Sequence, residues 1–204
     1  MAIRRRLQIL AKPDPHARDG RYLVRSLYFD NLEDKALREK VDGVNRREKF
    51  RIRCYNGDFS FIHLEKKCKW GALTRKESIP VSEETVQAIL QGRKPDGGIS
   101  PKGLLGELCR KMDTEGLRPK TIVDYVREPF VYGPGNVRVT LDYDIRTGIC
   151  GTDFLNPDCV MVPSGEPPVI LEVKWDAFLP DIIRDAVQLP GRMAGAYSKY
   201  AACR

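Results

Sequence analysis

The sequence lacks the features that mark several large classes of protein. Its 204 residues include six cysteines but no C-x-x-C pair, which argues against a zinc site and a disulfide framework. Neither of its two histidines has a neighbour typical of a catalytic triad or a metal site. No G-x-x-x-x-G-K-[ST] loop is present, which excludes a P-loop nucleotide site. No apolar run approaches the length of a membrane-spanning helix or a signal peptide, so we expect a soluble, cytoplasmic protein with free thiols.

Positive charge, by contrast, is in excess. The chain has 35 Lys and Arg residues against 28 Asp and Glu residues, for a formal net charge of +7. A hydrophobic content of 42% with 31% charged residues is typical of a globular protein, and the length suits a single domain over residues 1–204. The charge predicts an anionic partner, which could be nucleic acid, a phosphate compound or acidic lipid.

A predicted β-hairpin at residues 46–69 shows most clearly where this charge lies. Its strands join at Asn56-Gly57-Asp58, and Asn-Gly favours a tight hairpin turn. Because strand side chains alternate between faces, one face collects the charges. This face carries Arg47, Lys49, Arg51, Arg53 and Tyr55, then Phe61, His63, Glu65, Lys67 and Lys69. An ordinary hairpin with its charged face in water gives the same pattern, but like charges in a row repel, and a polyanionic ligand would neutralise them.

Predicted strands elsewhere repeat the pattern of one apolar and one charged face. They lie at residues 22–29, 74–79, 121–130, 137–142 and 169–174. Helices are predicted at residues 3–10, 30–40, 82–90 (capped by Ser82), 101–112 and 193–202, with a short helix after Pro180. The stretch between the predicted strands at 137–142 and 169–174, which contains Pro157 and Pro163, is predicted as loop. These elements predict an α+β fold, an antiparallel sheet curled into a barrel, with the helical pair at about 82–112 as an insertion.

A barrel interior with many cations and few carboxylates suits a phosphate chain and a divalent metal. Arg binds phosphate oxygens in bidentate fashion, and Lys adds point charge. Glu65 and Glu172 are candidate ligands for Mg²⁺ or Mn²⁺. Phosphoryl transfer depends mainly on positioning and charge neutralisation, so such a set could be catalytic without a Ser, Cys or His nucleophile.

Seven motifs in the chain together resemble the VTC domain. This is the catalytic domain of polyphosphate polymerases within the triphosphate tunnel metalloenzyme (CYTH-like) superfamily, here in the form found in bacteria. The motifs are RSLYFDN at 25–31, KFRIRCY at 49–55, LEKKCK at 64–69, DYVREPF at 124–130, VRVTLDYDI at 137–145, ILEVKWDAFLP at 170–180 and YSKY at 197–200. Each is weak alone, but the seven occur in the family's order from about residue 21 to the end.

The resemblance implies an antiparallel β-barrel that forms a basic tunnel, with flanking helices and a C-terminal helix. ATP as substrate, a divalent metal (Mn²⁺ or Mg²⁺) and the growing polyphosphate chain would bind inside it. The residues carried over as catalytic, phosphate-binding groups are Arg51, Arg53, Lys67, Arg127, Arg138 and Lys199. Glu172 would bind the metal, while Lys76, Lys174 and Glu65 could contact phosphate or metal, or form structural salt bridges. Tyr28 and Phe50 are expected in the core, and Trp70 is expected to pack against the fold.

One departure from the family leaves more than one function open. Family members begin with a wall strand carrying an R-x-E-x-K-type motif, and this sequence starts after it, so the first wall strand is absent from the sequence given. Either the start is mis-assigned, or the chain is shortened, or the protein lacks this strand. The alternatives are a polyphosphate polymerase, a hydrolase of inorganic triphosphate or nucleoside triphosphate, and a non-catalytic polyphosphate-binding module. Nucleic acid is disfavoured because aromatic residues are sparse among the cations. The sequence leaves open the metal, the oligomeric state and a membrane-protein partner that receives the polymer.

Overall fold

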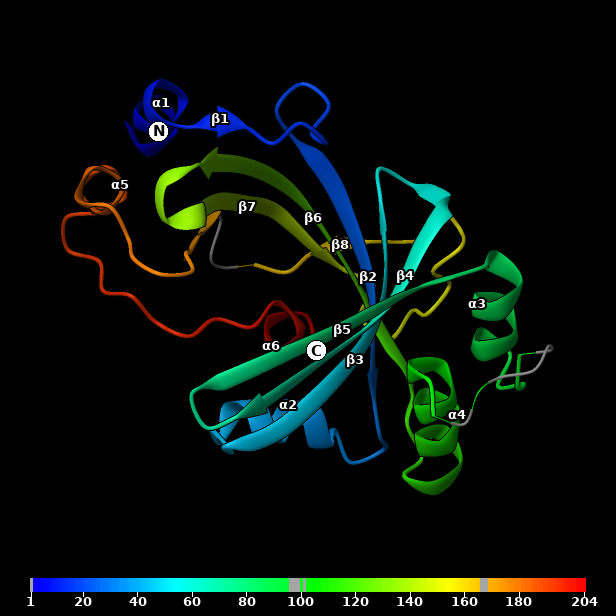
Figure 1. The fold of residues 1–204 in the computed structure, drawn as a ribbon. Coiled ribbons are helices and arrows are strands. Elements are labelled where there is room, and N and C mark those ends of the chain that lie inside the picture. The colour runs from blue at the N-terminus through cyan, green and yellow to red at the C-terminus, as the bar shows by residue number, and fades with distance from the viewer. Residues whose placement is uncertain (1, 96–99, 101, 166–168) are drawn as a thin grey trace. The chain divides into compact units, whose positions relative to one another are not determined.

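The chain folds around an antiparallel sheet, as predicted (Figure 1). The computed structural model describes residues 2–95, 100, 102–165 and 169–204. The strands are β1 (Lys12–Pro13), β2 (Tyr22–Asp30), β3 (Arg46–Tyr55), β4 (Asp58–Trp70), β5 (Leu73–Val81), β6 (Arg118–Tyr132), β7 (Val137–Thr147), β8 (Val162–Pro163) and β9 (Val169–Lys174). The helices are α1 (Ala2–Leu10), α2 (Lys35–Val41), α3 (Glu83–Leu90), α4 (Leu104–Thr114), the 3₁₀ turn η1 (Pro134–Asn136), α5 (Asp181–Ala186) and α6 (Lys199–Cys203).

The sheet runs in the order β5-β4-β3-β2-β6-β7-β8, with β1 paired to β6 and β9 paired to β7. The pairings with a defined register are all antiparallel within the described residues. In the same part of the chain, no pairing joins β5 to β8 or β9, so the sheet is not closed. The α+β class is therefore confirmed.

Contacts divide the chain into two compact units. Unit 1 comprises Met1–Leu23, Tyr125–Ile145 and Gly165–Tyr197, and unit 2 comprises Val24–Asp124, Arg146–Ser164 and Ser198–Arg204. The chain passes from one unit to the other within β2, β6 and β7. Neither unit is therefore one continuous segment of sequence.

The core of unit 2 forms where α3 and α4 cover one face of its strands (Figure 1). The strands supply Leu27, Phe29, Phe50, Ile52, Ile62 and Leu64, and the helices supply Val86, Ile89, Leu104, Leu108 and Met112. These strand residues alternate with polar ones, and this spacing directs every second side chain into the core. Burial of this apolar face stabilises the unit and fixes the register of β3 on β4, because a one-residue slip would expose it.

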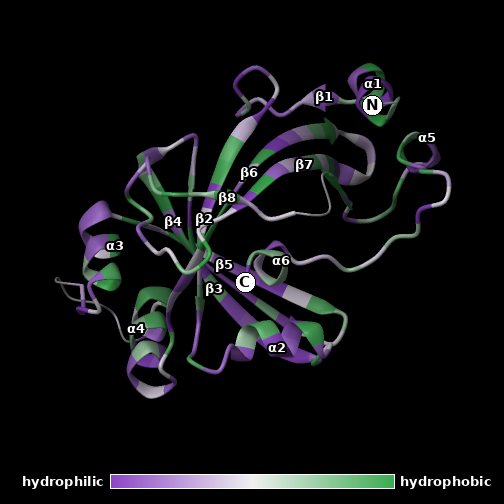
Figure 2. Cartoon of the chain, turned by 180° about the vertical axis from the view of Figure 1, so that it is seen from behind, coloured by the Kyte–Doolittle hydropathy of each residue, from purple (hydrophilic) through white to green (hydrophobic). Residues whose placement is uncertain are grey.

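The core of unit 1 is smaller and uses the same alternation. It contains Ile3 and Leu7 of α1, Val139 and Leu141 of β7, and Ile183 of α5, with Ala11, Phe130 and Val137 beside them. Figure 2 shows the alternation of hydrophilic and hydrophobic residues along β6 and β7. Each strand of this unit therefore has one face packed and one face left for polar contacts.

Several local predictions are confirmed. Asn56 and Gly57 have φ of 54° and 69°, the left-handed conformation that the two central positions of a tight hairpin turn require. Ser82 caps α3, because its Oγ accepts a hydrogen bond from the Thr85 amide at 3.3 Å. The six cysteines are free, as expected, and burial raises the pKa of the Cys54 thiol to about 12.

Other predicted boundaries are wrong. The helix expected at 30–40 begins only at Lys35, because residue 30 ends β2. The helix expected at 193–202 is confined to α6; Met193 is 97% exposed, so a helix there would gain little burial. The predicted loop contains the short strand β8. Pro101, the expected start of the helix at 101–112, lies outside the described residues, and α4 begins at Leu104.

Hydropathy gives a result of its own. No helix in the part of the chain that the structure describes combines the length and apolar content needed to cross a membrane.

Candidate functional site

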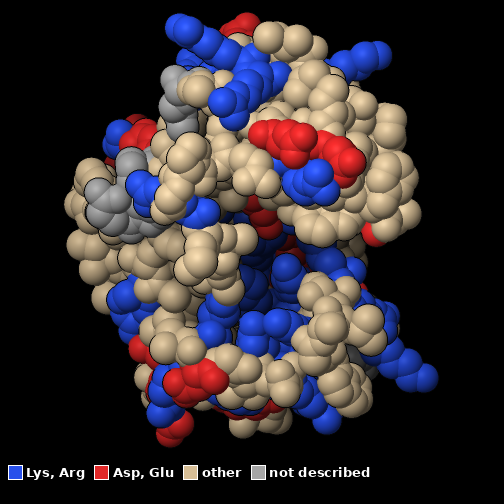
Figure 3. Space-filling model, turned by 90° about the vertical axis from the view of Figure 1, so that its left-hand side faces the viewer, with Lys and Arg blue, Asp and Glu red and all other residues tan. Residues whose placement is uncertain are grey.

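One face of β3, β4 and β5 in unit 2 collects basic side chains. Cross-strand pairing places Lys49 beside Lys67, Lys67 beside Lys76, and Arg47 beside Lys69. Like charges in such positions repel each other. No carboxylate forms an ion pair with Lys49, Lys67 or Lys69 among the described residues. We name this set the cationic strand face; it consists of Arg47, Lys49, Arg51, Arg53, Lys67, Lys69 and Lys76. Figure 3 shows how densely Lys and Arg side chains gather on one side of the molecule.

Glu65 lies opposite Arg51 within this face and is only 4% exposed. Arg51 Nη2 lies 2.6 Å from Glu65 Oε2, and Lys76 Nζ lies 2.6 Å from Oε1. Burial alone would raise the pKa of Glu65, but the charges of Arg51 and Arg53 and the hydrogen bonds from Lys76 and Arg51 lower it to about 2. Both oxygens of Glu65 are therefore engaged by cations.

Tyr28 borders the cationic strand face and pairs with Arg51 in the β2–β3 register. Arg51 Nη1 donates a hydrogen bond to Tyr28 Oη at 3.3 Å, and Lys49 Nζ lies 5.7 Å from the centre of the ring. The ring also stacks on Tyr200 at a centroid distance of 5.1 Å. Burial alone would raise the pKa of Tyr28, but Arg51, Lys49 and Arg53 lower it to about 7. Tyr28 is buried, as the sequence predicts, but it belongs to a charged environment.

Arg53 and Arg25 occupy contrasting environments in the same unit. Arg53, on the cationic strand face, donates from Nε to Ser26 Oγ at 2.9 Å. Arg25 pairs with Asp124 at 2.9 Å, with both side chains buried, and donates to the Asn156 carbonyl at 2.6 Å. Arg25 is thus a structural cation, whereas Ser26 orients Arg53 within the cationic strand face.

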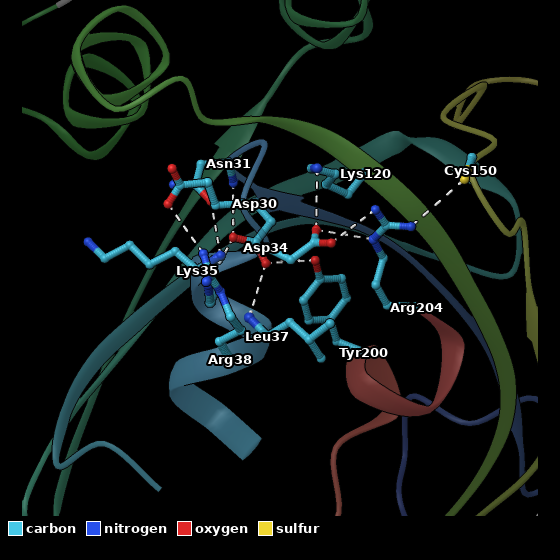
Figure 4. Close-up of polar contacts among 12 residues, drawn as sticks. Asp30, Asn31, Asp34, Lys35, Leu37, Arg38, Lys120, Cys150, Tyr200 and Arg204 are labelled. Atoms are coloured by element: carbon cyan, nitrogen blue, oxygen red, sulfur yellow. Dashed lines mark hydrogen bonds and ion pairs between the residues drawn. The ribbon is translucent and has the colours of Figure 1, made fainter. Parts of the chain in front are cut away.

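Lys199 is the first residue of α6, which is attached firmly to β2 and α2 (Figure 4). Tyr200 donates from its hydroxyl to Asp30 Oδ2 at 2.8 Å. Asp30 also accepts the amide hydrogen of Ala36 at 2.8 Å and so holds the start of α2. Burial, followed by the nearby charge of Asp30, raises the pKa of Tyr200. Tyr200 therefore joins the segment that carries Lys199 to Tyr28, on which its ring stacks.

A second charged group lies in unit 1 around Arg127. Arg127 binds the carboxylate of Asp142 through two hydrogen bonds of 2.6 Å, and its Nη2 lies 3.8 Å from Glu172 Oε2. Asp142 is fully buried. Burial disfavours the charge on Arg127, but the hydrogen bonds to Asp142 outweigh this and raise its pKa. Lys174 Nζ lies 3.3 Å from Glu172 Oε1.

Arg138 and Thr140 lie on the same face of β7 as Asp142. Arg138 Nη2 donates to Asp14 Oδ2 at 2.9 Å and to Tyr22 Oη at 2.7 Å. Arg138 Nε and Thr140 Oγ1 are buried and have no hydrogen-bond partner among the described residues. Buried polar atoms of this kind usually find partners, so these two atoms are candidates for contact with a ligand.

The two predicted metal ligands fit a divalent metal to different degrees. The described residues contain no cluster of three or more His, Cys, Asp and Glu suited to a metal, so a bound phosphate would have to supply further ligands, as is common for Mg²⁺. Glu172 fits better, because its contacts with Arg127 and Lys174 are longer, at 3.8 and 3.3 Å, and its side chain is 41% exposed. Thr140, directly opposite on β7, also has the orphaned hydroxyl. Glu65 fits poorly, because Arg51 and Lys76 engage both of its oxygens.

The structure thus sorts the predicted site residues into two groups. Unit 2 holds Arg51, Arg53, Glu65, Lys67, Lys76 and Lys199, and unit 1 holds Arg127, Arg138, Glu172 and Lys174. Sequence reasoning missed Tyr28, Thr140 and Asp142 as site residues. The alternation of Arg138, Thr140 and Asp142 along one strand was visible, but nothing local showed that Asp142 pairs with Arg127 or that Tyr28 pairs with Arg51.

Two solved structures resemble the fold weakly. A crystal structure from Bacillus halodurans, described as a candidate adenylate cyclase, has a TM-score of 0.46 and 14% identity over 72% of this chain and 66% of its own. A structure of a protein from Pyrococcus horikoshii OT3 has a TM-score of 0.42 and 12% identity over 91% of this chain and 78% of its own. Scores this low carry no argument about function. No match was found among curated proteins.

The family comparison is decisive, because it covers the whole sequence. The model of the VTC domain matches residues 1–204. The chain therefore belongs to the VTC domain family.

Proposed function

We propose that this chain is a metal-dependent polyphosphate polymerase that transfers the γ-phosphate of ATP to a growing polyphosphate chain. One observation carries the proposal: Lys49, Lys67 and Lys69 lie side by side with no carboxylate paired to them among the described residues. Adjacent strands lie about 5 Å apart, and alternate residues on one strand lie about 7 Å apart, so the charges form a closely spaced array. A linear polyanion would neutralise this array, and VTC family membership supports a polyphosphate or triphosphate ligand.

The site residues of unit 2 would have different roles in binding. Lys67 and Lys69 would supply point charge, and Arg51 and Arg53 would donate to phosphate oxygens in bidentate fashion. Glu65 holds the Arg51 guanidinium and the Lys76 ammonium group in place, so both are pre-organised before the ligand arrives. Lys199 would add a phosphate contact from α6, because Tyr200 fixes that helix to β2.

In unit 1, Arg127 and Arg138 would bind phosphate oxygens, with Lys174 beside them. Asp142 fixes the orientation of the Arg127 guanidinium. A divalent metal bound at Glu172, with the Thr140 hydroxyl nearby, would offset charge on the phosphates. The polar groups of this unit are therefore suited to orient a triphosphate.

The proposed reaction is a phosphoryl transfer. A terminal phosphate oxygen of the chain forms a bond to the γ-phosphorus of ATP, and the bond from that phosphorus to the bridging oxygen breaks. The electron pair leaves with ADP, and the chain is extended by one phosphate. Positioning and charge neutralisation by the basic side chains would lower the barrier. This chemistry needs no protein nucleophile.

The test is incubation of the purified chain with ATP and Mn²⁺ or Mg²⁺, with polyphosphate, ADP and free phosphate measured together. A polymerase yields polymer and a matching amount of ADP. Free phosphate without polymer would identify a hydrolase, and polyphosphate binding without turnover would identify a binding module. Either result would reject the polymerase.

Three variants connect this test to the structure. Arg51→Ala should weaken triphosphate binding by about 10- to 100-fold, the loss expected for a hydrogen bond to a charged group. Glu172→Gln should retain much of the binding and lose turnover. Arg75→Ala is the matched control, because it removes a cation from the opposite face of β5, and it should behave like the parent. If Arg51→Ala and Glu172→Gln both matched the parent, the assignment of the site would be wrong.

A further inference from the structure

The strands that carry the cationic strand face end in an exposed apolar tip. Trp70, at the end of β4, is 68% exposed, and Leu73, at the start of β5, is 77% exposed. Val44, in the turn before β3, is 40% exposed. The prediction that Trp70 packs against the fold is therefore wrong. Large apolar side chains this exposed are unremarkable one by one, but three that gather at one end of a sheet mark a candidate interaction surface.

Strand pairing and turn contacts bring these side chains together. Arg46 pairs with Trp70 across β3 and β4, and Trp70 pairs with Leu73 across β4 and β5, so all three share one face. The Arg46 guanidinium lies 4.8 Å from the centre of the Trp70 ring. The Gly71 amide donates to the Asn45 carbonyl at 3.0 Å, which ties the β4–β5 turn to the segment that contains Val44. We name Val44, Arg46, Trp70 and Leu73 the hairpin-tip patch.

This patch continues the face that forms the core of unit 2. Further along the same strands, Phe50, Ile52 and Leu64 are covered by α3 and α4. Trp70 and Leu73 belong to no core cluster among the described residues. The strands thus extend beyond their covering helices, and their apolar face is left in contact with solvent at the tip.

Basic side chains flank the apolar ones, and Glu48, in the next cross-strand pair on the same face, is neutralised by Lys66 and Lys111. Arg46 lies within the patch, and Arg47 and Lys69 form a cross-strand pair on the reverse side of the same strand ends. No carboxylate forms an ion pair with Arg46, Arg47 or Lys69 among the described residues. Trp favours the boundary between water and hydrocarbon, and long basic side chains can lie with apolar stems buried and charged ends among phosphate groups. Apolar insertion combined with basic charge is the pairing of signals that gives stable attachment to a bilayer surface.

We propose that the hairpin-tip patch binds the surface of an anionic lipid bilayer. Trp70 and Leu73 insert at the level of the headgroups, and Arg46, Arg47 and Lys69 contact lipid phosphates. A second copy of the chain is a poorer occupant, because its own basic side chains would face these ones. The apolar area of three side chains is also small for a stable dimer.

The test uses the full chain with Trp175→Phe, which leaves Trp70 as the only tryptophan. Vesicles of phosphatidylcholine mixed with phosphatidylglycerol should sediment the protein and shift Trp70 emission to shorter wavelength. Phosphatidylcholine vesicles should do neither. Trp70→Ser with Leu73→Ser should reduce sedimentation at least about tenfold, the loss expected when one of two membrane signals is removed. Leu32→Ser is the matched control, because Leu32 is 88% exposed outside the patch, and it should bind like the parent.

Three outcomes would overturn the proposal. The first is no sedimentation with anionic vesicles. The second is sedimentation with Trp70 emission unchanged, which would show that basic side chains away from the strand tips, such as Lys49 and Lys67, make the contact. The third is self-association of the parent that the double variant abolishes, which would identify a second copy as the occupant. Both positions of the double variant are exposed, so loss of folding is not expected, and circular dichroism verifies this.

Discussion

The two faces of β3, β4 and β5 both carry many charged side chains, but the charges are balanced differently. On the face toward α4, Lys66 lies 3.0 Å from Glu48 and 2.5 Å from Glu107. Lys111 of α4 lies 2.5 Å from the same Glu48. On the opposite face, Lys49 and Lys67 lie beside each other, and the nearest carboxylate of that face, Glu65, is engaged by other cations.

This difference distinguishes a structural charge network from the proposed binding surface. The network of Lys66 and Lys111 is neutralised within the fold. Burial alone would lower the pKa of Lys66, but its hydrogen bonds to Glu107 and Glu48 outweigh this and raise the pKa. The cationic strand face keeps its repulsion, which reduces stability and which a bound anion would relieve. A surface that lowers stability and is neutralised by a ligand is typical of a functional site.

The largest expected effect is on stability and comes from the neutralised face. Lys66→Met should lower the free energy of unfolding by about 2–3 kcal/mol, because Glu107 and Glu48 lose a partner in a partly buried setting. Denaturant unfolding measures it. Lys67→Met is the matched control, because it changes the next residue on the opposite face and should alter stability by less than about 0.5 kcal/mol. Equal losses for the two variants would show that the faces do not differ.

Glu65→Gln tests whether Glu65 is a counter-ion or a metal ligand. It should lower stability by about 1–2 kcal/mol at neutral pH, because Arg51 and Lys76 lose a charged partner. The pKa of Glu65 is depressed to about 2 in the folded protein, so its contribution is present above the normal pKa of about 4.5 and is lost as the pH falls through about 2. Acid unfolding of the variant should be correspondingly less steep. A loss of metal dependence with triphosphate binding intact would instead identify Glu65 as a metal ligand.

Lys67→Met should weaken binding of polyphosphate about tenfold, which corresponds to about 1.4 kcal/mol. The affinity of the parent should also fall steeply with salt, because the contacts are between charges of opposite sign. Titration calorimetry at two salt concentrations measures both effects. Unchanged affinity in Lys67→Met would remove this residue, and the array that it belongs to, from the binding site.

The smallest expected effect is a pH dependence that arises from Tyr28, whose pKa is lowered to about 7. A phenolate in this position repels phosphate, so triphosphate affinity should fall a few-fold as the pH rises through about 7. Stability should change in the opposite direction. Between about pH 7 and 10 the unfolded chain holds a proton that the folded protein has lost, so this term adds stability as the pH rises. Tyr28→Phe should flatten both profiles; profiles identical to those of the parent would assign the dependence to another group.

Local features of the fold were readable from the sequence because they depend on a few neighbouring residues. Asn56-Gly57 predicted the hairpin turn, and Ser82 predicted the start of α3. The start of α2 was not readable, because Asp30 reaches forward from β2 to accept the amides of Ala36 and Leu37. Such a contact depends on the path of the chain between Asp30 and these two amides.

The candidate site divides in the same way. The side on which each strand charge lies follows from alternation, and the cationic strand face was predicted on that basis. The residues that contact this face are decided by strand register, which places both Tyr28 and Glu65 directly opposite Arg51 on the neighbouring strands. Asp142 binds Arg127 from a different strand, fifteen positions along the chain. These contacts were therefore visible only in the folded structure.

The sequence by itself determined the periodicity of the strands, the excess of positive charge and the face on which that charge lies, because each depends on residue type and alternation alone. The tertiary structure decided which charges are neutralised. Glu48 lies between Lys66 and Lys111 because α4 packs on that face, whereas no carboxylate forms an ion pair with Lys49 or Lys67 among the described residues. The physical reason is that ion pairing acts over a few ångströms, and only packing brings residues distant in sequence that close.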